Sequence, residues 1–98
     1  METKKKTAKQ MERHFKGVAN HNRIDILILV SDNAQLSVEE ITKNLDRNFK
    51  TISEHARRLV GAGLLNKEYR GRRVIHSLSP YGKEFVKFIK SFQTLQHS

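Results

Sequence analysis

Residues 36–63 decide the fold, and they read LSVEEITKNLDRNFKTISEHARRLVGAG. The first part of this stretch carries the signal for a short helix. Ser37 and Glu40 form a Ser-x-x-Glu capping box, in which each side chain satisfies a free backbone N–H group at a helix start. The buried face of this helix is expected to hold three apolar residues: Val38, Ile41 and Leu45.

The second part of the stretch predicts another helix after a tight turn at residues 46–48. Asn48 is a suitable N-cap for it. Apolar residues then follow at spacings of three, four and three, which is the stripe of an amphipathic helix: Phe49, Ile52, Ala56 and Leu59. The helix is expected to end at residues 61–63 (Gly-Ala-Gly), where glycine permits the left-handed C-cap conformation.

Beyond Leu64 the pattern changes from helical to alternating. Residues 65–70 and 74–78 alternate in side-chain character on either side of an Arg-Gly-Arg turn at 70–72, which predicts a two-stranded hairpin with a basic tip. Ser79 and Pro80 then provide the cap and first position of a last helix. Its aromatic and aliphatic stripe comprises Tyr81, Phe85, Phe88, Ile89 and Phe92.

Two more helices are expected before residue 36. Residues 8–18 carry the helical stripe Ala8, Met11, Phe15 and Val18. Residues 22–30 are apolar almost all round, so they form either a helix in the middle of the core or a buried strand. Helix is favoured because Asn20 can cap it and a polar loop follows at 31–33. Residues 1–7 are expected to be a flexible basic N-terminus, and residues 8–98 a single domain.

This order of elements indicates a mainly α fold with a small β-hairpin: a winged helix-turn-helix of about five helices plus a two-stranded wing.

The positive charge is concentrated where such a fold would meet nucleic acid. The net charge is +9, and residues 47–73 alone contain eight Lys or Arg and two Glu. Such segregation favours a polyanionic partner, because Lys and Arg displace counterions condensed on phosphates. An acidic membrane surface or an acidic protein is the alternative.

Several functional classes find no support in the composition. Cys is absent, which excludes disulfides, thiolate metal sites and Cys nucleophiles. The sequence shows no signal peptide and no membrane-span pattern, so an intracellular, soluble, cytoplasmic protein is expected. It also lacks a nucleophile motif, a phosphate-binding loop and a metal triad, and we expect no enzyme activity, no cofactor and no metal. The five scattered histidines could sense metal or pH, but ordinary surface or half-buried histidines are the simpler interpretation.

The sequence resembles the ArsR-type family of repressors over roughly residues 8–92. The segments that carry the resemblance are Ala-Asn-His-Asn-Arg-Ile (19–24), Leu-Ser-Val-Glu-Glu-Ile (36–41), Thr-Ile-Ser-Glu-His (51–55), Leu-Val-Gly-Ala-Gly-Leu-Leu (59–65) and Arg-Gly-Arg-Arg-Val (70–74). The Ser-Pro-Tyr-Gly-Lys start of the last helix is also similar to multiple-antibiotic-resistance-type and phenolic-acid-type regulators. The resemblance implies a winged helix-turn-helix that binds DNA as a dimer.

The sequence departs from that family at several positions. Arg47 replaces a usually apolar turn residue, and Phe49 stands where a polar groove contact is common, so Phe49 is expected to supply the missing packing. The family's paired-Cys site is impossible here, and its last-helix zinc site is unmatched, since only Glu84 and His97 are available.

Two sets of residues are candidates for binding. The expected DNA contacts lie on the outer face of the second helix of the motif and at the hairpin tip: Asn48, Lys50, Thr51, Ser53, Glu54, His55, Arg57, Arg58, Arg70, Arg72 and Arg73. A solvated helix face and a hairpin merely protected by charge are the alternatives. The expected dimer seam comprises Met11, Phe15, Phe85, Phe88, Ile89 and Phe92, with plain core as the alternative.

We therefore expect a transcriptional regulator, most simply a repressor, that binds an inverted repeat in double-stranded DNA as a homodimer. Within this class the alternative is constitutive DNA binding without an effector, and no sequence feature identifies a small-molecule effector. A different class of function is also open: a winged-helix module of the transcription machinery that binds protein or RNA.

Overall fold

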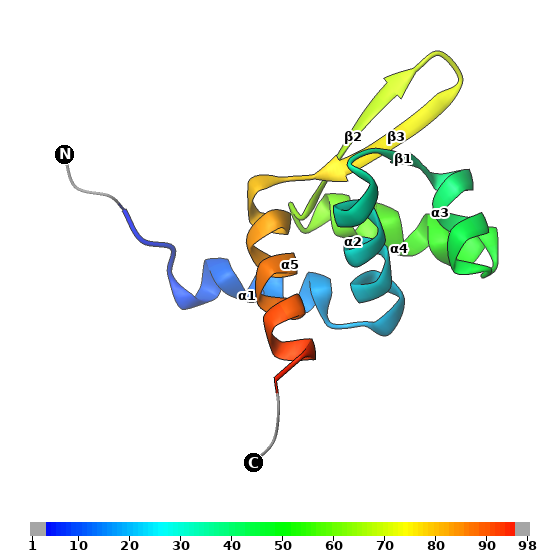
Figure 1. Ribbon diagram of the computed structural model, residues 1–98. Coiled ribbons are helices and arrows are strands. Elements are labelled where there is room, and N and C mark those ends of the chain that lie inside the picture. The colour runs from blue at the N-terminus through cyan, green and yellow to red at the C-terminus, as the bar shows by residue number, and fades with distance from the viewer. Residues whose placement is uncertain (1–3, 96–98) are drawn as a thin grey trace.

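The computed structural model describes residues 4–95, which form five helices and a three-stranded antiparallel sheet (Figure 1). The winged helix-turn-helix prediction is confirmed. None of the helices within 4–95 is both long and apolar enough to cross a membrane. The elements are α1 (Ala8–Val18), α2 (His21–Asn33), β1 (Leu36–Ser37), α3 (Val38–Leu45), α4 (Phe49–Gly61), β2 (Leu65–Arg70), β3 (Arg73–Leu78) and α5 (Pro80–Gln93).

Side-chain caps fix the starts of the helices. The four predicted caps are confirmed at Asn20, Ser37, Asn48 and Ser79, and Pro80 is the first residue of α5. A fifth cap was not predicted: Thr7 and Gln10 form a capping box. This cap fixes the start of α1 at Ala8. Residues 1–3 of the predicted flexible N-terminus lie outside the described part of the chain.

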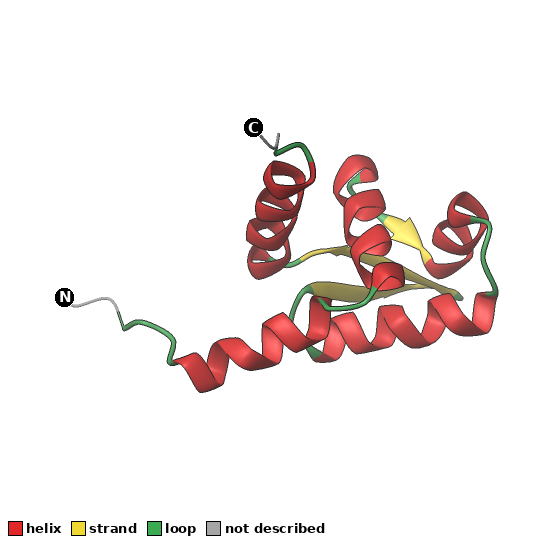
Figure 2. Ribbon diagram, turned by 90° about the horizontal axis from the view of Figure 1, so that it is seen from below, coloured by secondary structure: helices red, strands yellow, loops and turns green. Residues whose placement is uncertain are grey.

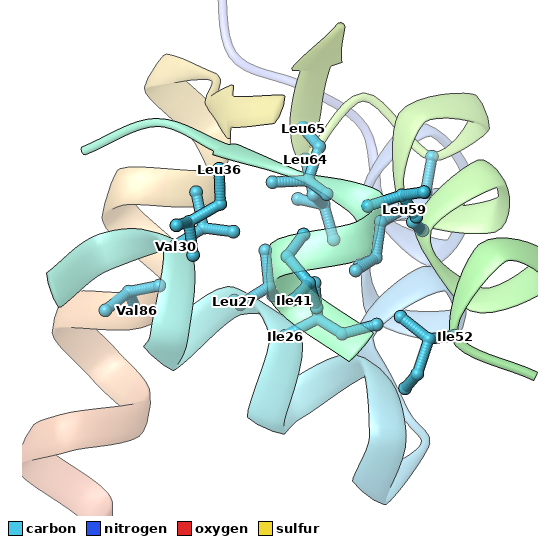
Figure 3. Close-up of a cluster of buried hydrophobic side chains, with 13 residues drawn as sticks. Ile26, Leu27, Val30, Leu36, Ile41, Ile52, Leu59, Leu64, Leu65 and Val86 are labelled. Atoms are coloured by element: carbon cyan, nitrogen blue, oxygen red, sulfur yellow. The ribbon is translucent and has the colours of Figure 1, made fainter. Parts of the chain in front are cut away.

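The apolar run at residues 22–30 is helical, and the strand alternative was wrong. Helix α2 buries Ile26, Leu27 and Val30 completely, and these side chains meet residues of α3, α4, α5 and the sheet in one cluster (Figure 3). Burial of an aliphatic side chain of this size contributes roughly 1.5–3 kcal/mol. The core is therefore organised around α2, with the helix-turn-helix on one side of it.

The predicted hairpin is formed by β2 and β3, which pair antiparallel with Arg70 opposite Arg73. Gly71 adopts a φ of 63° there, a left-handed conformation that glycine tolerates without strain. One strand was not predicted: the two-residue β1 pairs with β3, which gives the order β1-β3-β2. Figure 1 shows the hairpin projecting beyond the helices as the wing.

The turn of the helix-turn-helix is tied to α2. Asp46 takes a left-handed φ of 50°, which ends α3, and the Arg47 side chain returns to α2. The Arg47 guanidinium donates to Asp25 at 2.6 Å and to the Asn22 side chain at 2.9 Å. The expected packing role of Phe49 was wrong: its ring is 49% exposed. Polar contacts of Arg47 therefore hold the turn where an apolar residue was expected to pack.

The outer helices bury different faces from the predicted stripes. Helix α1 turns His14 and Gly17 to the core, and α5 turns Gly82 and Val86 inward. The larger side chains of the stripes remain at the surface, with Phe15, Phe88 and Phe92 each more than half exposed. Close helix packing on small residues explains the difference, since a Cβ atom built on Gly17 would lie 2.3 Å from that of Ala62. In Figure 2 the helix nearest the N-terminus, α1, lies along the lower edge of the molecule, and α5 stands above it.

Candidate nucleic-acid interface

The side of α4 that turns away from the core faces the wing across an open groove. The groove has a volume of about 740 Å³ and runs between the outer face of α4 and the strands β2 and β3. It brings together six of the predicted contact residues, all from α4: Lys50, Thr51, Ser53, Glu54, His55 and Arg57. The other five predicted residues do not line it: Asn48, Arg58, Arg70, Arg72 and Arg73.

The two arginines of α4 share one carboxylate. Arg57 and Arg58 follow Glu54 by three and four residues, about one helical turn, and their guanidinium groups contact its Oε1 atom at 2.8 and 3.0 Å. Hydrogen bonds from Arg57 and the positive charge of both side chains lower the pKa of Glu54. All three side chains reach solvent, so a phosphate could replace the carboxylate as their partner. Lys50 and Thr51 on the same face are exposed.

Two histidines line the groove with their Nδ1 atoms buried. Neither His55 Nδ1 nor His76 Nδ1 has a hydrogen-bond partner among residues 4–95. Burial lowers the pKa of both side chains, with a further contribution from Arg23 and Arg58 at His55 and from Lys67 at His76. The expectation of surface or half-buried histidines was wrong for His14 and His76, which are buried. His14 instead donates its Nδ1–H to the Ala62 carbonyl oxygen, at 2.7 Å.

The three arginines of the wing differ in their partners. Arg70 pairs with Glu68 on its own strand at 2.8 Å, and Arg73 reaches Glu40 at the start of α3, also at 2.8 Å. The pKa of Glu40 is lowered by the Ser37 backbone N–H and by Arg73. Arg72 is exposed and forms no ion pair with any residue between 4 and 95. Among the three wing arginines, Arg72 is thus the one with no carboxylate partner in the described chain.

The side-chain oxygen of Asn48 is occupied at the helix cap, because it accepts the N–H of Thr51 at 3.1 Å. Eight residues of the groove were not predicted as site residues, and three of them are exposed: Phe49, Lys67 and Tyr69. Lys67 and Tyr69 are paired across the hairpin with His76 and Val74. Directly opposed residues share a face of a sheet, so the alternation of the strand could have indicated them once the register was known.

A second surface feature lies on α1, α2 and α5. An apolar groove of about 390 Å³ is lined by Phe15, Ile24, Ile28, Phe85, Phe88, Ile89 and Phe92 together with Val18. The rings of Phe15 and Phe85 pack edge to face with centroids 5.1 Å apart. Five of the six residues predicted for the dimer seam are brought together here. Met11 is 40% exposed and does not line the groove.

Metal-binding residues do not gather in the described part of the molecule. Among residues 4–95, no three His, Asp or Glu side chains form a cluster that could hold a metal ion. His97, one of the two residues available for a last-helix zinc site, lies outside the described residues.

This architecture is shared with known proteins. The model of the HVO_A0114 family matches residues 18–83, two thirds of the chain. No curated protein matches the sequence. Among solved structures, HlyU from Vibrio cholerae is 27% identical, with a TM-score of 0.80, over 91% of this chain and 97% of that one.

Two more distant structures show the same fold. The transcriptional repressor PagR of Bacillus anthracis is 21% identical, with a TM-score of 0.76, over 83% of this chain and 93% of that one. The homodimeric winged helix-turn-helix DNA-binding domain Mb0332 of Mycobacterium bovis, a possible ArsR-family regulator, is 22% identical, with a TM-score of 0.81, over 100% of this chain and 96% of that one. The chain therefore belongs to the HVO_A0114 family, and its fold is the winged helix-turn-helix of ArsR-type regulators.

Proposed function

We propose that the protein is a sequence-specific regulator of transcription that binds double-stranded DNA. The observation that carries this proposal is the groove between α4 and the wing, where exposed Lys50 and Arg57 stand beside Lys67 of β2. A helix of this kind fits the major groove and presents donors to base edges, while a projecting hairpin reaches the flanking backbone. HlyU and PagR share the fold, and PagR is a transcriptional repressor.

The proposed roles separate the two elements. Lys50, Thr51, Ser53, Glu54, His55, Arg57 and Arg58 of α4, with Asn48 at its cap, form the base-reading surface. Arg70, Arg72 and Arg73 of the wing contact phosphates. Because Arg70 already pairs with Glu68 and Arg73 with Glu40, phosphates must replace these carboxylates on binding, whereas Arg72 is available at once. Arg57 must in the same way exchange Glu54 for a base edge. Phosphate contacts position the protein, and base contacts give it specificity.

The acting species is proposed to be a homodimer. Residues 8–98 would form the DNA-binding and dimerisation domain, with residues 1–7 as a basic N-terminal extension. The apolar groove of α1, α2 and α5 exposes Phe15 by 56%, Phe88 by 60% and Phe92 by 66%. A contiguous apolar patch of this kind on a small protein marks an interaction surface, and a second copy would cover it by two-fold symmetry.

Repression by occupation of a promoter is the simplest consequence of such binding. A two-fold dimer should protect an inverted repeat whose half-sites are roughly 34 Å apart, or a multiple of that spacing, along the duplex. Fragments of the source genome selected by the full chain, followed by footprinting, test this proposal. Protection of a single asymmetric half-site would contradict the dimeric mode. Tighter binding to structured RNA than to every duplex would contradict the DNA function and favour an RNA-binding module.

A further inference from the structure

The exposed ring of Phe49 stands at the first residue of α4, immediately after its cap. The other residues of the predicted stripe, Ile52, Ala56 and Leu59, are at most 1% exposed, so the core is complete without this ring. A single exposed apolar side chain is ordinary on a protein surface. Phe49 differs because it lines the groove together with a second exposed aromatic residue, Tyr69, which is 69% exposed.

The surroundings of Phe49 combine apolar walls with positive charge. Val60 on α4 and Val74 on β3 line the same groove as the two aromatic rings, and Lys50 and Lys67 stand among them. Lys67 Nζ lies 5.7 Å from the centre of the Tyr69 ring. An apolar floor with ammonium groups beside it matches a partner that offers both anionic and apolar groups. The major groove of DNA is such a surface, because its phosphates flank base edges of which one carries a methyl group.

We propose that Phe49 is a specificity-determining residue that packs against the 5-methyl group of a thymine in each half-site. This inference rests on the proposed DNA-binding function and extends it. The N-terminal residues of a recognition helix are the ones that approach base edges, and Phe49 is the first helical residue of α4. The phenyl ring can neither donate nor accept a conventional hydrogen bond, so it distinguishes bases by apolar contact alone.

Thymine is the base that such a contact selects. In the major groove, adenine, guanine and cytosine present amino groups, ring nitrogens or carbonyl oxygens, whereas thymine adds a methyl group next to its carbonyl. A polar edge covered by a phenyl ring would lose water without gaining a partner, which is unfavourable. Burial of one methyl group is expected to change affinity by about fourfold.

The experiment uses the full chain and the duplex that it selects best. Each thymine is replaced singly by uracil, which removes the 5-methyl group and leaves every hydrogen-bonding atom in place. For the wild-type protein we expect an affinity loss of about fourfold at one thymine in each half-site and little change at the others. The Phe49→Ala variant should bind the unmodified duplex about fourfold more weakly than the wild-type protein does. It should bind the unmodified duplex and the uracil duplex with the same affinity.

Lys50→Ala is the matched control, since it alters the neighbouring side chain of the same helix turn. It should weaken binding to both duplexes and keep the fourfold sensitivity to uracil. Should Phe49→Ala bind too weakly to measure, 5-iodouracil at the sensitive position of the wild-type complex provides an independent test. Irradiation is then expected to crosslink that base to the peptide that contains Phe49, as identified by mass spectrometry.

Three outcomes would overturn the inference, and they are distinguishable. If the wild-type protein binds a selected duplex but no uracil substitution weakens binding, Phe49 reads no methyl group and the proposed DNA function stands. Unchanged uracil sensitivity in Phe49→Ala, or a crosslink to a different residue, would assign the methyl contact to another side chain. If the wild-type protein prefers no duplex over random DNA or RNA, the proposed function fails and this inference fails with it.

Discussion

Arg47 binds Asp25 across the interface between the helix-turn-helix and α2, with Nη2 2.6 Å from Oδ2. Arg47→Ala is expected to lower the free energy of unfolding by about 1 kcal/mol, because both side chains are about one third exposed and solvent screens part of their attraction. Urea unfolding measures this change. Lys43 is an exposed residue of α3, and Lys43→Ala is the matched control. It should change the free energy of unfolding by less than about 0.5 kcal/mol. Equal losses in the two variants would show that the Arg47 pair does not tie α4 to α2.

The close approach of α1 to the end of α4 depends on Gly17. A Cβ atom at this position would lie 2.3 Å from the Cβ atom of Ala62, whereas one at Gly61 would meet nothing within 4 Å. Gly17→Ala is therefore expected to destabilise the protein by about 1–3 kcal/mol, and Gly61→Ala to stabilise it by about 0.4–1 kcal/mol. Thermal unfolding of the two variants checks the contrast. A higher melting temperature for Gly17→Ala than for Gly61→Ala would contradict the packing of α1.

The apolar groove of α1, α2 and α5 should hold the dimer together. Replacement of Phe88 and Ile89 by Asp would place two charges on this surface, so the double variant is expected to be monomeric at micromolar concentration. Light scattering of wild-type and variant proteins gives the masses. Lys87→Asp, which alters an exposed neighbour outside the groove, should remain dimeric. A monomeric wild-type protein, or a dimeric double variant, would show that the seam lies elsewhere.

The buried His76 should make the stability of the protein depend on pH. Burial, reinforced by Lys67 and opposed by Glu39, lowers the pKa of His76 below the ordinary value of 6.5. The unfolded chain therefore binds a proton more readily than the folded one, and the free energy of unfolding decreases as the pH falls through 6.5 toward the folded pKa. Above about pH 7.5 this contribution is constant.

Urea unfolding at pH 7.5 and 5.5 measures this dependence. His76→Gln is expected to show a smaller decrease between the two pH values than the wild-type protein, whatever its stability at pH 7.5. A matched substitution of the exposed His21 by Gln should leave the decrease close to that of the wild type. An equal decrease in the wild-type and His76→Gln proteins would contradict the assignment to His76.

The architecture could be predicted from the sequence because its decisive signals are local. The side-chain caps at Ser37, Asn48 and Ser79 each accept a hydrogen bond from the backbone N–H three residues later. The alternation of the wing and the glycine in its turn are equally local. The strand β1 could not be predicted, since two residues carry no periodicity and its pairing with β3 depends on the tertiary fold.

Contacts between distant residues explain what the sequence did not predict in the site. Arg47 departs from an apolar pattern, and its partner Asp25 stands 22 residues earlier in the chain, so the expected packing role of Phe49 was wrong. The place of Lys67 and Tyr69 in the groove depends on how the hairpin lies against α4. The aromatic stripe of α5 and Phe15 predicted a dimer seam, but it did not indicate that the smaller Gly17, Gly82 and Val86 turn to the core.

The most direct test of the account compares α4 with the wing by titrating DNA at several salt concentrations. Lys50→Ala should weaken binding to the selected duplex by about 1–3 kcal/mol while changing binding to random duplex far less, because base contacts carry specificity. Arg72→Ala should weaken binding to both duplexes equally and flatten the plot of log affinity against log salt concentration by about 0.9, because one phosphate contact is lost. If Arg72→Ala changes sequence preference while Lys50→Ala loses only general affinity, the roles of α4 and the wing are reversed. If neither substitution matters, the DNA-binding surface lies elsewhere.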